Sequence, residues 1–561
     1  MNYTSTRGTV AVNETYALLH GLAEDGGLYV PSLFPTNCLT YNDVKDKNYQ
    51  EVAAIVLSKL FPCFSEAHLN EMINSAYSDA NFSTRDIAPL HSLLEKVSVL
   101  ELFHGRTQAF KDMALSLFPY LLVAAKEAEG EKKEVLILTA TSGDTGKAAL
   151  EGFKDVPGTH IQVFYPTDGV SPMQAEQMQK QEGNNVNVTA IHGNFDDAQQ
   201  FLKRLFVDKT TAEEVAAKGV MFSSANSINI GRLAPQVVYY VNAYAELVAQ
   251  GAIHGNFDDA QQFLKRLFVD KETAEEVAEK GVMFSSANSI NIGRLAPQVV
   301  YYVNAYTELV AQGAIHEDEA FNVVVPTGNF GNILAAYYAK KMGIPIGKLI
   351  CASNQNNVLT EFFETGTYDM NRPFYTTISP SMDILESSNF ERFLYYISGE
   401  DSERTAGWMK DLKATGKLTV NEEEFSRVKA NFAGAYVDDE ETKAIIEQVY
   451  NSYGYVMDPH TAVAMGAYMK ELEKHPEDGA RHTIIASTAH PFKFPTAICE
   501  ALDIKVGETP YESLDNISAI TGVAFPKQLE ALKSKSLRFT KAIDKEDMKQ
   551  EILNFVDTFS K

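Results

Sequence analysis

The sequence has little basic charge and no long apolar run. Among 561 residues, 49 Lys and Arg stand against 74 Asp and Glu, which gives a formal net charge of -25. A negative surplus of this size repels nucleic acid and anionic membrane surfaces. Without a run of about 18 apolar residues, no membrane-spanning helix is expected. These absences exclude nucleic acid and membrane as partners and favour a small molecule.

Cysteine is also scarce, and we expect no targeting segment. Cys38, Cys63, Cys351 and Cys499 are scattered without the spacing of a metal site, which predicts reduced, buried thiols and no metal. The start, MNYTSTRGTVAVNETY, has neither the basic nor the apolar section of a signal peptide, so we expect a cytoplasmic protein. With 45% hydrophobic and 22% charged residues, the composition is that of an ordinary globular protein.

Hydrophobic spacing divides the chain into three predicted domains. Residues 1–98 read as a mainly helical N-terminal domain, residues 99–320 as a smaller α/β domain, and residues 321–561 as the rest of a larger α/β domain with C-terminal helices. Short apolar runs alternate with helical stretches from residue 99 onward, which predicts parallel strands joined by crossover helices. Such sheets bind ligands in loops at the carboxyl ends of their strands. The expected strands are 134–140, 161–166, 185–191, 321–328, 348–353 and 482–488.

A 62-residue segment occurs twice in direct succession. Residues 190–251 recur at 252–313, and only three pairs of positions differ: Thr210 and Glu272, Ala217 and Glu279, Ala245 and Thr307. A solenoid needs at least about three such units, so we interpret the repeat as a single tandem duplication. Each copy predicts two helices, a short strand and a long helix, in the first copy Asp196 to Val207, Thr211 to Lys218, 220–224 and from about Ile230. We expect one copy to fill the fold and the other to form a surface insertion, since long insertions add little closure entropy.

The stretch 102–122 sets Lys111 in an apolar, helix-like context. A lysine there either extends its amine to the surface or is used chemically. Three later segments, 139–149, 325–340 and 487–494, each supply a different part of a phosphate-bearing cofactor site. Together they make Lys111 a candidate for Schiff-base chemistry.

The segment 326-PTGNFGN-332 joins a strand end, a glycine turn and a helix start, which directs backbone N–H groups at one place and predicts an anion site. The alternative is that the glycine turn serves only the packing of strand and helix and binds no anion.

The nucleotide P-loop is excluded, because Ala148 follows Gly146-Lys147 and Thr141 stands where the first glycine of that motif belongs.

Two further strand-to-helix junctions carry polar side chains. The loop 141-TSGDTG-146 offers hydroxyls and a carboxylate that suit an amino acid's carboxylate or a ring hydroxyl, with a plain helix cap as the alternative. The sequence SSANSINIGR, at 223–232 and 285–294, ends in an arginine whose donors suit a phosphate; a surface arginine is the alternative.

In this order, FHGRTQAFKD, LTATSGDTG, SSANSINIGR, PTGNFGN and STAHPFKF resemble the threonine synthase family of fold type II pyridoxal-phosphate enzymes. The likeness covers nearly the whole chain, including ETYALLHGLAEDGGLYVP near the start, and the duplication is its one departure. It implies an α/β fold of two open, mostly parallel sheets flanked by helices, plus a mainly helical N-terminal domain.

The resemblance also implies roles for individual residues. Lys111 would hold pyridoxal 5'-phosphate and later move protons as base and acid, and Thr488 would hydrogen-bond the pyridine nitrogen. The cofactor phosphate would be cradled by Gly328, Asn329, Phe330 and Asn332, and Asp144 would lie near the ring hydroxyl. The implied substrate-binding residues are Ser142, Thr145, Asn226, Asn288, Arg232, Arg294 and Lys493, of which either arginine, with Lys493, would hold the substrate phosphate.

The reaction implied by the family converts O-phospho-L-homoserine and water to L-threonine and phosphate, by γ-elimination and then β-addition. A related phospholyase or a serine/threonine dehydratase would need the same lysine and cofactor loops. A catalytically silent remnant disrupted by the duplication is an alternative of another class. A monomer or homodimer is expected.

Overall fold

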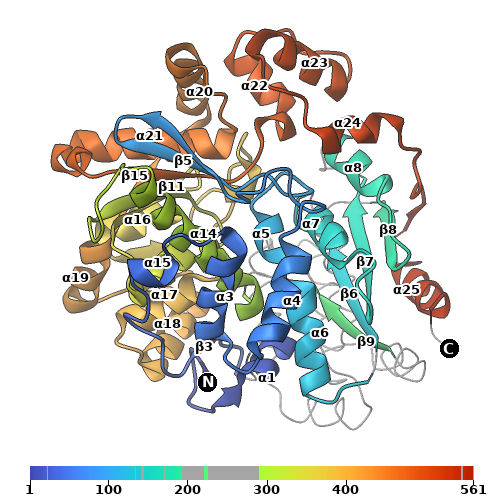
Figure 1. Cartoon of the computed structure of the whole chain (residues 1–561), viewed down its shortest axis with the longest axis horizontal. Helices are drawn as coiled ribbons and strands as arrows, with labels where there is room; N and C mark the ends of the chain where they lie inside the picture. Colours follow the sequence, from blue (N-terminus) through green and yellow to red (C-terminus); the bar gives the residue numbers. More distant parts are fainter. Residues whose placement is uncertain are drawn as a thin grey trace. The chain divides into compact units, whose positions relative to one another are not determined.

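The computed structural model describes residues 1–21, 23, 25–132, 134–140, 144–167, 172–192, 220–224, 290–544 and 547–559 (Figure 1). The chain forms two compact units. The first comprises Met1, Leu33–Leu117 and Leu295–Ser534, and the second comprises Asn2–Ser32, Phe118–Arg294 and Lys535–Lys561. The limits of these units differ from the predicted domain boundaries after residues 98 and 320. The division into three domains stays a prediction.

The first unit contains a six-stranded sheet in the order β14-β11-β10-β15-β5-β4. Its strands are β4 (Leu90–Leu94), β5 (Val97–Glu101), β10 (Phe321–Pro326), β11 (Ile346–Ser353), β14 (Phe432–Tyr436) and β15 (Thr483–Ser487). All neighbours pair in parallel except β4, which lies antiparallel to β5 at one edge. Every residue of β10 and β15 is buried, as expected for central parallel strands whose two faces are both covered.

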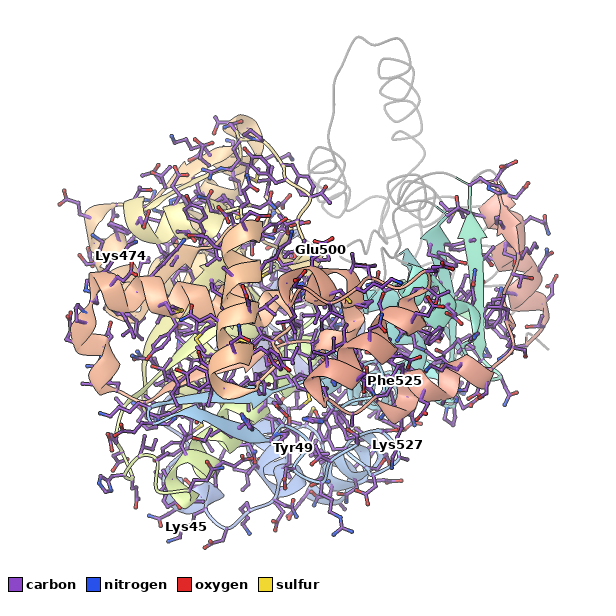
Figure 2. All side chains as sticks on the ribbon, turned by 90° about the horizontal axis from the view of Figure 1, so that it is seen from above. Lys45, Tyr49, Lys474, Glu500, Phe525 and Lys527 are labelled. Atoms are coloured by element: carbon purple, nitrogen blue, oxygen red, sulfur yellow. The ribbon has the colours of Figure 1, made fainter. Side chains whose placement is uncertain are left out.

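The first unit also contains many helices. They are α2 (Tyr41–Val44), α3 (Tyr49–Leu60), α4 (Glu66–Ala76), α5 (Lys111–Leu115), α14 (Ile292–Ala311), α15 (Gly331–Met342), α16 (Val358–Thr365), α17 (Phe390–Ile397), α18 (Ser402–Thr415), α19 (Glu422–Asn431), α20 (Asp439–Tyr453), α21 (Pro459–Lys474), α22 (Pro495–Ala501), α23 (Pro510–Thr521) and α24 (Lys527–Ser534). Of these helices, α15, α16, α19 and α21 pack on the sheet. Helix α21 packs on β10, β11, β14 and β15 and buries almost all of its first three turns. On α3, the buried Tyr49 (Figure 2) meets Tyr77 edge-on, with ring centroids 5.1 Å apart.

The second unit contains a fully parallel sheet of five strands in the order β16-β8-β7-β6-β9. Its elements are β6 (Glu134–Ala140), β7 (Thr159–Pro166), β8 (Val186–Ile191), β9 (Val220–Ser224), β16 (Ala542–Ile543), α1 (Glu14–His20), α6 (Phe118–Ala128), α7 (Asp144–Phe153), α8 (Pro172–Gln179) and α25 (Met548–Asp557). Two open, mostly parallel sheets flanked by helices confirm the predicted α/β fold class. No helix in the described parts of the chain is long and apolar enough to cross a bilayer.

The sequence reading missed a small antiparallel sheet at the N-terminus. Strands β1 (Asn2–Ser5), β2 (Val12–Asn13) and β3 (Tyr29–Pro31) pair in the order β2-β1-β3. Strands of two to four residues are too short to show alternation, so only the helical spacing of the predicted N-terminal domain was visible.

The prediction of four buried thiols is correct only in part. Cys351 and Cys499 are buried, but Cys63 is exposed and Cys38 is half-buried. Cys63 lies in the turn between α3 and α4, where helical periodicity ends and no longer indicates burial.

The described fold draws on both copies of the repeat. Strand β9, paired with β6, comes from the first copy, whereas α14 comes from the second. The equivalent strand at 282–286, the equivalent helix at 230–249 and the predicted helices Asp196 to Val207 and Thr211 to Lys218 lie outside the described residues. Our expectation that one copy fills the fold and the other forms a surface insertion stays a prediction, because most of both copies lies outside the described residues.

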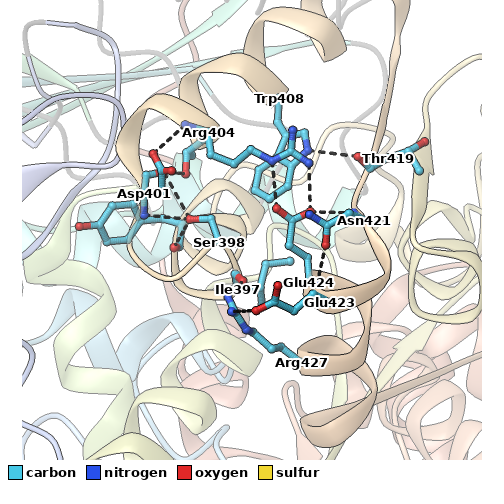
Figure 3. Close-up of polar contacts among 12 residues, drawn as sticks. Ile397, Ser398, Asp401, Arg404, Trp408, Thr419, Asn421, Glu423, Glu424 and Arg427 are labelled. Carbon is cyan, nitrogen blue, oxygen red and sulfur yellow. Dashed lines mark hydrogen bonds and ion pairs between the residues drawn. The ribbon is translucent and has the colours of Figure 1, made fainter.

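Helices α18 and α19 are joined by a compact polar cluster (Figure 3). The Arg404 guanidinium donates to both carboxylate oxygens of Glu424, at 2.9 and 3.0 Å, and lies 4.4 Å above the Trp408 ring. Glu424 also accepts from the Asn421 backbone N–H at 2.7 Å, which closes a capping box at the start of α19. One carboxylate thus satisfies an arginine and a helix end together.

Replacing Glu424 with alanine should destabilise this region by about 2 kcal/mol, because the change removes both the bidentate pair and half of the capping box. Equilibrium urea unfolding would measure the loss. Glu423→Ala is the matched control: Glu423 pairs with Arg427 but its side chain is 78% exposed, so its loss should stay below about 1 kcal/mol. Equal losses in the two variants would contradict the assignment.

Glu308 on α14 is half-buried, and desolvation raises the pKa of its carboxyl to about 7. It accepts from the Leu90 backbone N–H at 3.1 Å and from Asn304 Nδ2 at 2.7 Å, which offset part of the cost of its charge. Because the folded state holds this proton more tightly than the unfolded state, stability from this group is present at low pH and is lost as pH rises from about 4.5 to 7.

Glu308→Gln should remove that pH dependence. At pH 8 the variant should gain stability relative to the native chain, by up to about 3 kcal/mol, and near pH 4.5 the gain should vanish. Urea unfolding across this pH range measures the difference, with Glu447→Gln on the exposed face of α20 as control. A gain that is the same at every pH would show that folding does not raise the pKa of this carboxyl.

Candidate active site

Three of the predicted motifs follow three neighbouring strands of the first unit. Strands β10, β15 and β5 pair side by side in parallel, so their carboxyl ends lie at one edge of the sheet. The segments that leave this edge are 327–331 after β10, 488–493 after β15 and 102–112 after β5. The topology thus brings the glycine turn, Thr488 and the Lys111 segment to the edge where such sheets bind ligands.

The Lys111 segment is held against the Thr488 segment by backbone hydrogen bonds. The Phe110 N–H donates to the Thr488 carbonyl at 2.8 Å, and the His490 N–H donates to the Gln108 carbonyl at 3.1 Å. Ala109 and Ala489 form an antiparallel bridge between these bonds. Lys111 is half-buried at the start of α5, with Nζ 5.3 Å from the Phe110 ring centroid.

The loop before Lys111 is tightened by a buried carboxylate. Asp112 accepts from the Thr107 backbone N–H at 2.8 Å and from Thr107 Oγ1 at 2.7 Å. Gly105 packs directly on it: a Cβ at this position would lie 2.4 Å from the Asp112 Cβ. Lys493, buried in the Thr488 segment, donates to the Thr107 carbonyl at 3.0 Å. Both sides of the Lys111 loop are therefore held by polar groups.

The glycine turn after β10 is clamped by a distant loop. Ser387 Oγ donates to the Gly328 carbonyl at 2.8 Å, and the Asn389 N–H donates to the Asn329 carbonyl at 3.0 Å. A Cβ on Gly328 would lie 2.4 Å from the Ser381 carbonyl oxygen, so this approach requires glycine. Sequence reasoning missed the 381–389 loop, because residues that hold another loop's backbone leave no motif of their own.

Helix α15 begins at this turn. Phe330 adopts a left-handed conformation, with φ of 62°, and caps the helix. The first N–H groups of a helix lack intrahelical acceptors and carry partial positive charge. Asn332, in the first turn, is buried; its Oδ1 accepts from Tyr301 and Tyr302 at 2.6 Å each, while its Nδ2 has no partner in the described chain. The turn therefore presents unpaired donors, as an anion site requires.

A buried polar chain connects the clamping loop to β15. Asp458 caps α21 and accepts from His460 Nδ1 at 2.8 Å, which leaves Nε2 to accept from the Ser381 N–H at 3.2 Å. Asp458 also accepts from the Thr461 hydroxyl, which lies 2.9 Å from Ser487 Oγ, the residue before Thr488. Two of the three site segments are thus anchored to one helix start.

His490, in the Ala-His-Pro motif, acts as a neutral acceptor. Burial, with the charges of His104 and Lys493, lowers its pKa to about 3. Its Nδ1 accepts from the Phe492 N–H at 3.2 Å. The histidine of this motif therefore stabilises the conformation of the Thr488 segment.

The remaining predicted residues belong to the second unit or lie outside the described residues. Asp144 is buried at the start of α7 and accepts from Gln174 Nε2 at 3.1 Å; Thr145 follows it. Arg294 is buried, and burial lowers its pKa to about 10. The residues outside the described part are Ser142, Asn226, Asn288 and Arg232.

Gly105→Ala should displace Asp112 from Thr107, because the new methyl group would overlap the carboxylate. We expect a loss of about 2 kcal/mol in unfolding free energy, in the range for strain and broken buried hydrogen bonds. Gly407→Ala is the control, since a Cβ there meets nothing within 4 Å. Unchanged stability in Gly105→Ala would mean that the loop relaxes freely.

Comparison with known proteins places these features in one family. The family models "Threonine synthase N terminus" and "Threonine synthase, C-terminal" match residues 2–77 and 461–552. Human threonine synthase-like 1 is 36% identical over 92% of this chain, which spans only 61% of that protein. The threonine synthases of Schizosaccharomyces pombe and Pseudomonas aeruginosa are 34% and 35% identical over 90% and 91% of this chain and 89% and 92% of their own lengths.

Solved structures agree with these sequence relatives. The structure of PLP-bound threonine synthase from Brucella melitensis is 32% identical, with a TM-score of 0.78 and full coverage of both chains. Yeast threonine synthase is 29% identical, also with a TM-score of 0.78, over 100% of this chain and 99% of its own. The chain therefore belongs to the threonine synthase family.

Proposed function

We propose that the chain is a pyridoxal-phosphate-dependent threonine synthase, a carbon–oxygen lyase acting on phosphates. It converts O-phospho-L-homoserine and water to L-threonine and phosphate by γ-elimination and then β-addition. The observation that carries this proposal is the meeting of three motifs at the carboxyl ends of β5, β10 and β15. Membership of the family and the likeness to a PLP-bound relative support it.

The residues at this edge fit the chemistry of pyridoxal phosphate. The cofactor presents a phosphate, an aromatic nitrogen and an aldehyde, which call for an anion site, a hydrogen-bonding group and an amine. The anion site is the turn with Gly328, Asn329, Phe330 and Asn332, whose buried Nδ2 lacks a partner in the described chain. Thr488 offers the hydroxyl and Lys111 the amine. When bound, the cofactor supplies the electron-withdrawing group that acidifies carbon-bound protons of the substrate.

Lys111 holds the cofactor and then moves protons at the substrate's α- and β-carbons. Its place on a loop fastened at both ends keeps the amine within a narrow range of positions, which proton transfer requires. A threonine hydroxyl at the aromatic nitrogen forms a hydrogen bond without the negative charge that would keep the nitrogen protonated. Thr488 therefore moderates how strongly the ring withdraws electrons.

The substrate side requires a second anion site, because cofactor and substrate each carry a phosphate. Arg294 or Arg232, with Lys493, are the residues we assign to the substrate phosphate. With a pKa of about 10, the buried Arg294 is still charged at neutral pH and suits this role. We assign Ser142 and Thr145 to the substrate carboxylate, Asp144 to the ring hydroxyl, and Asn226 or Asn288 to further substrate contacts.

The proposal also includes the location, the oligomeric state and the origin of the repeat. We propose a cytoplasmic enzyme that is a monomer or homodimer and that remains active with one 62-residue tandem duplication.

The deciding experiment is the absorbance spectrum of the purified, cofactor-supplemented chain, with product analysis. The native chain should show the visible band of lysine-bound pyridoxal phosphate, and O-phosphohomoserine should shift the band and yield threonine and phosphate in equal amounts. Lys111→Ala should lack the band and lose at least about 100-fold of the activity. Lys59→Ala, on the exposed face of α3, is the control.

The products separate the competing functions. Phosphate and 2-oxobutanoate in place of threonine would indicate a phospholyase, and 2-oxobutanoate formed from added threonine would indicate a dehydratase. A folded chain without the band would mean that the duplication has silenced the site.

A further inference from the structure

We propose that Tyr301 and Tyr302 are positioning residues that orient the Asn332 amide toward the phosphate of the cofactor. Both tyrosines lie on α14 and donate to Asn332 Oδ1, at 2.6 Å each. The other side of the amide, Nδ2, is buried in the first turn of α15 and has no partner in the described chain. The inference rests on the proposed function for the identity of the phosphate compound.

An asparagine amide has no preferred orientation of its own. Its oxygen and nitrogen ends have nearly the same shape, so the surrounding donors and acceptors decide which end points where. Two hydroxyl donors on one side hold the oxygen there, and the NH₂ group must then face the opposite side. A donor facing a phosphate attracts it, whereas the reversed amide would present an oxygen and repel it.

The tyrosines can fill this role because they remain donors. Burial raises the pKa of both hydroxyls well above the usual value, so each keeps its proton at every working pH. The Tyr301 hydroxyl also lies 3.3 Å from Gln298 Oε1, but the shorter contact to Asn332 is the better-formed bond. Both hydroxyls thus converge on one acceptor.

The buried and unpaired Nδ2 points to a ligand. A buried donor without an acceptor is costly, and native structures rarely keep one without a reason. It stands at a helix start whose own N–H groups favour an anion. An anion at that place would accept from Nδ2 and remove the cost, and the tyrosines would have set the amide in advance.

The chain provides two matched controls. Tyr306, on the same helix, accepts from the Asp318 N–H at 3.3 Å, whereas the described hydrogen bonds to Asn332 Oδ1 come from Tyr301 and Tyr302. Tyr306→Phe therefore removes a hydroxyl of the same helix from another place. The first repeat copy carries the same pair as Tyr239 and Tyr240, outside the described residues. Tyr239→Phe/Tyr240→Phe therefore makes the identical change in the other copy.

The test compares the affinities of the chain for pyridoxal phosphate and for pyridoxal, which lacks the phosphate. Tyr301→Phe/Tyr302→Phe should weaken pyridoxal phosphate binding by about 10-fold or more, as expected when a hydrogen bond to a charged group is lost. Pyridoxal binding should change little, because only the phosphate contact is affected. The pyridoxal phosphate affinity of each single variant should lie between those of the native chain and the double variant. Both control variants should keep native affinity.

A double-mutant cycle shows whether the tyrosines act through Asn332. In an Asn332→Ala background, the tyrosine changes should cause no further loss of pyridoxal phosphate affinity. The same loss in both backgrounds, or an equal loss for pyridoxal, would overturn the positioning role. A loss in the Tyr239→Phe/Tyr240→Phe chain alone would overturn the assignment to the second copy. A native chain that binds neither compound would overturn the inference and the proposed function together, whereas native binding with unaffected variants would overturn the inference alone.

Discussion

Parallel pairing of β10, β15 and β5 is the constraint on which the site depends. Because the strands run in the same direction, all three end at one edge, and the segments that follow them meet there although they are far apart in the sequence. A change of direction in any one strand would send its motif to the opposite edge. Complete burial of β10 and β15 fixes their place at the centre of the sheet.

A second layer of polar residues gives the loops their shape. Asp112 closes the Lys111 loop, Asp458 and His460 anchor the loop that clamps the glycine turn, and Tyr301 with Tyr302 set the Asn332 amide. In each case a buried acceptor or donor is satisfied by a loop or by a neighbouring helix. The expense of leaving such groups unpaired holds each loop in one conformation.

The repeat shows how little local sequence decides when two segments differ at only three pairs of positions. The described strand β9 belongs to the first copy and the described helix α14 to the second. Either copy has the apolar pattern for both elements, so periodicity cannot choose between them. The described helix α14 carries the tyrosines that contact Asn332, and the first copy carries the same pair as Tyr239 and Tyr240.

The sequence by itself determined most elements and the central motifs. Apolar periodicity located strands such as β6 and helices such as α3. The motifs around Lys111, the glycine turn and Thr488, in this order, indicated the family, because these signals are local. Only the tertiary structure decided which residues support them. The roles of Ser387, His460 and the tyrosine pair depend on contacts between segments far apart in the chain. Such contacts produce no periodic pattern in the sequence. The exposure of Cys63 and the strand β1 were missed for a related reason: turns and very short strands are defined by their neighbours rather than by their own pattern.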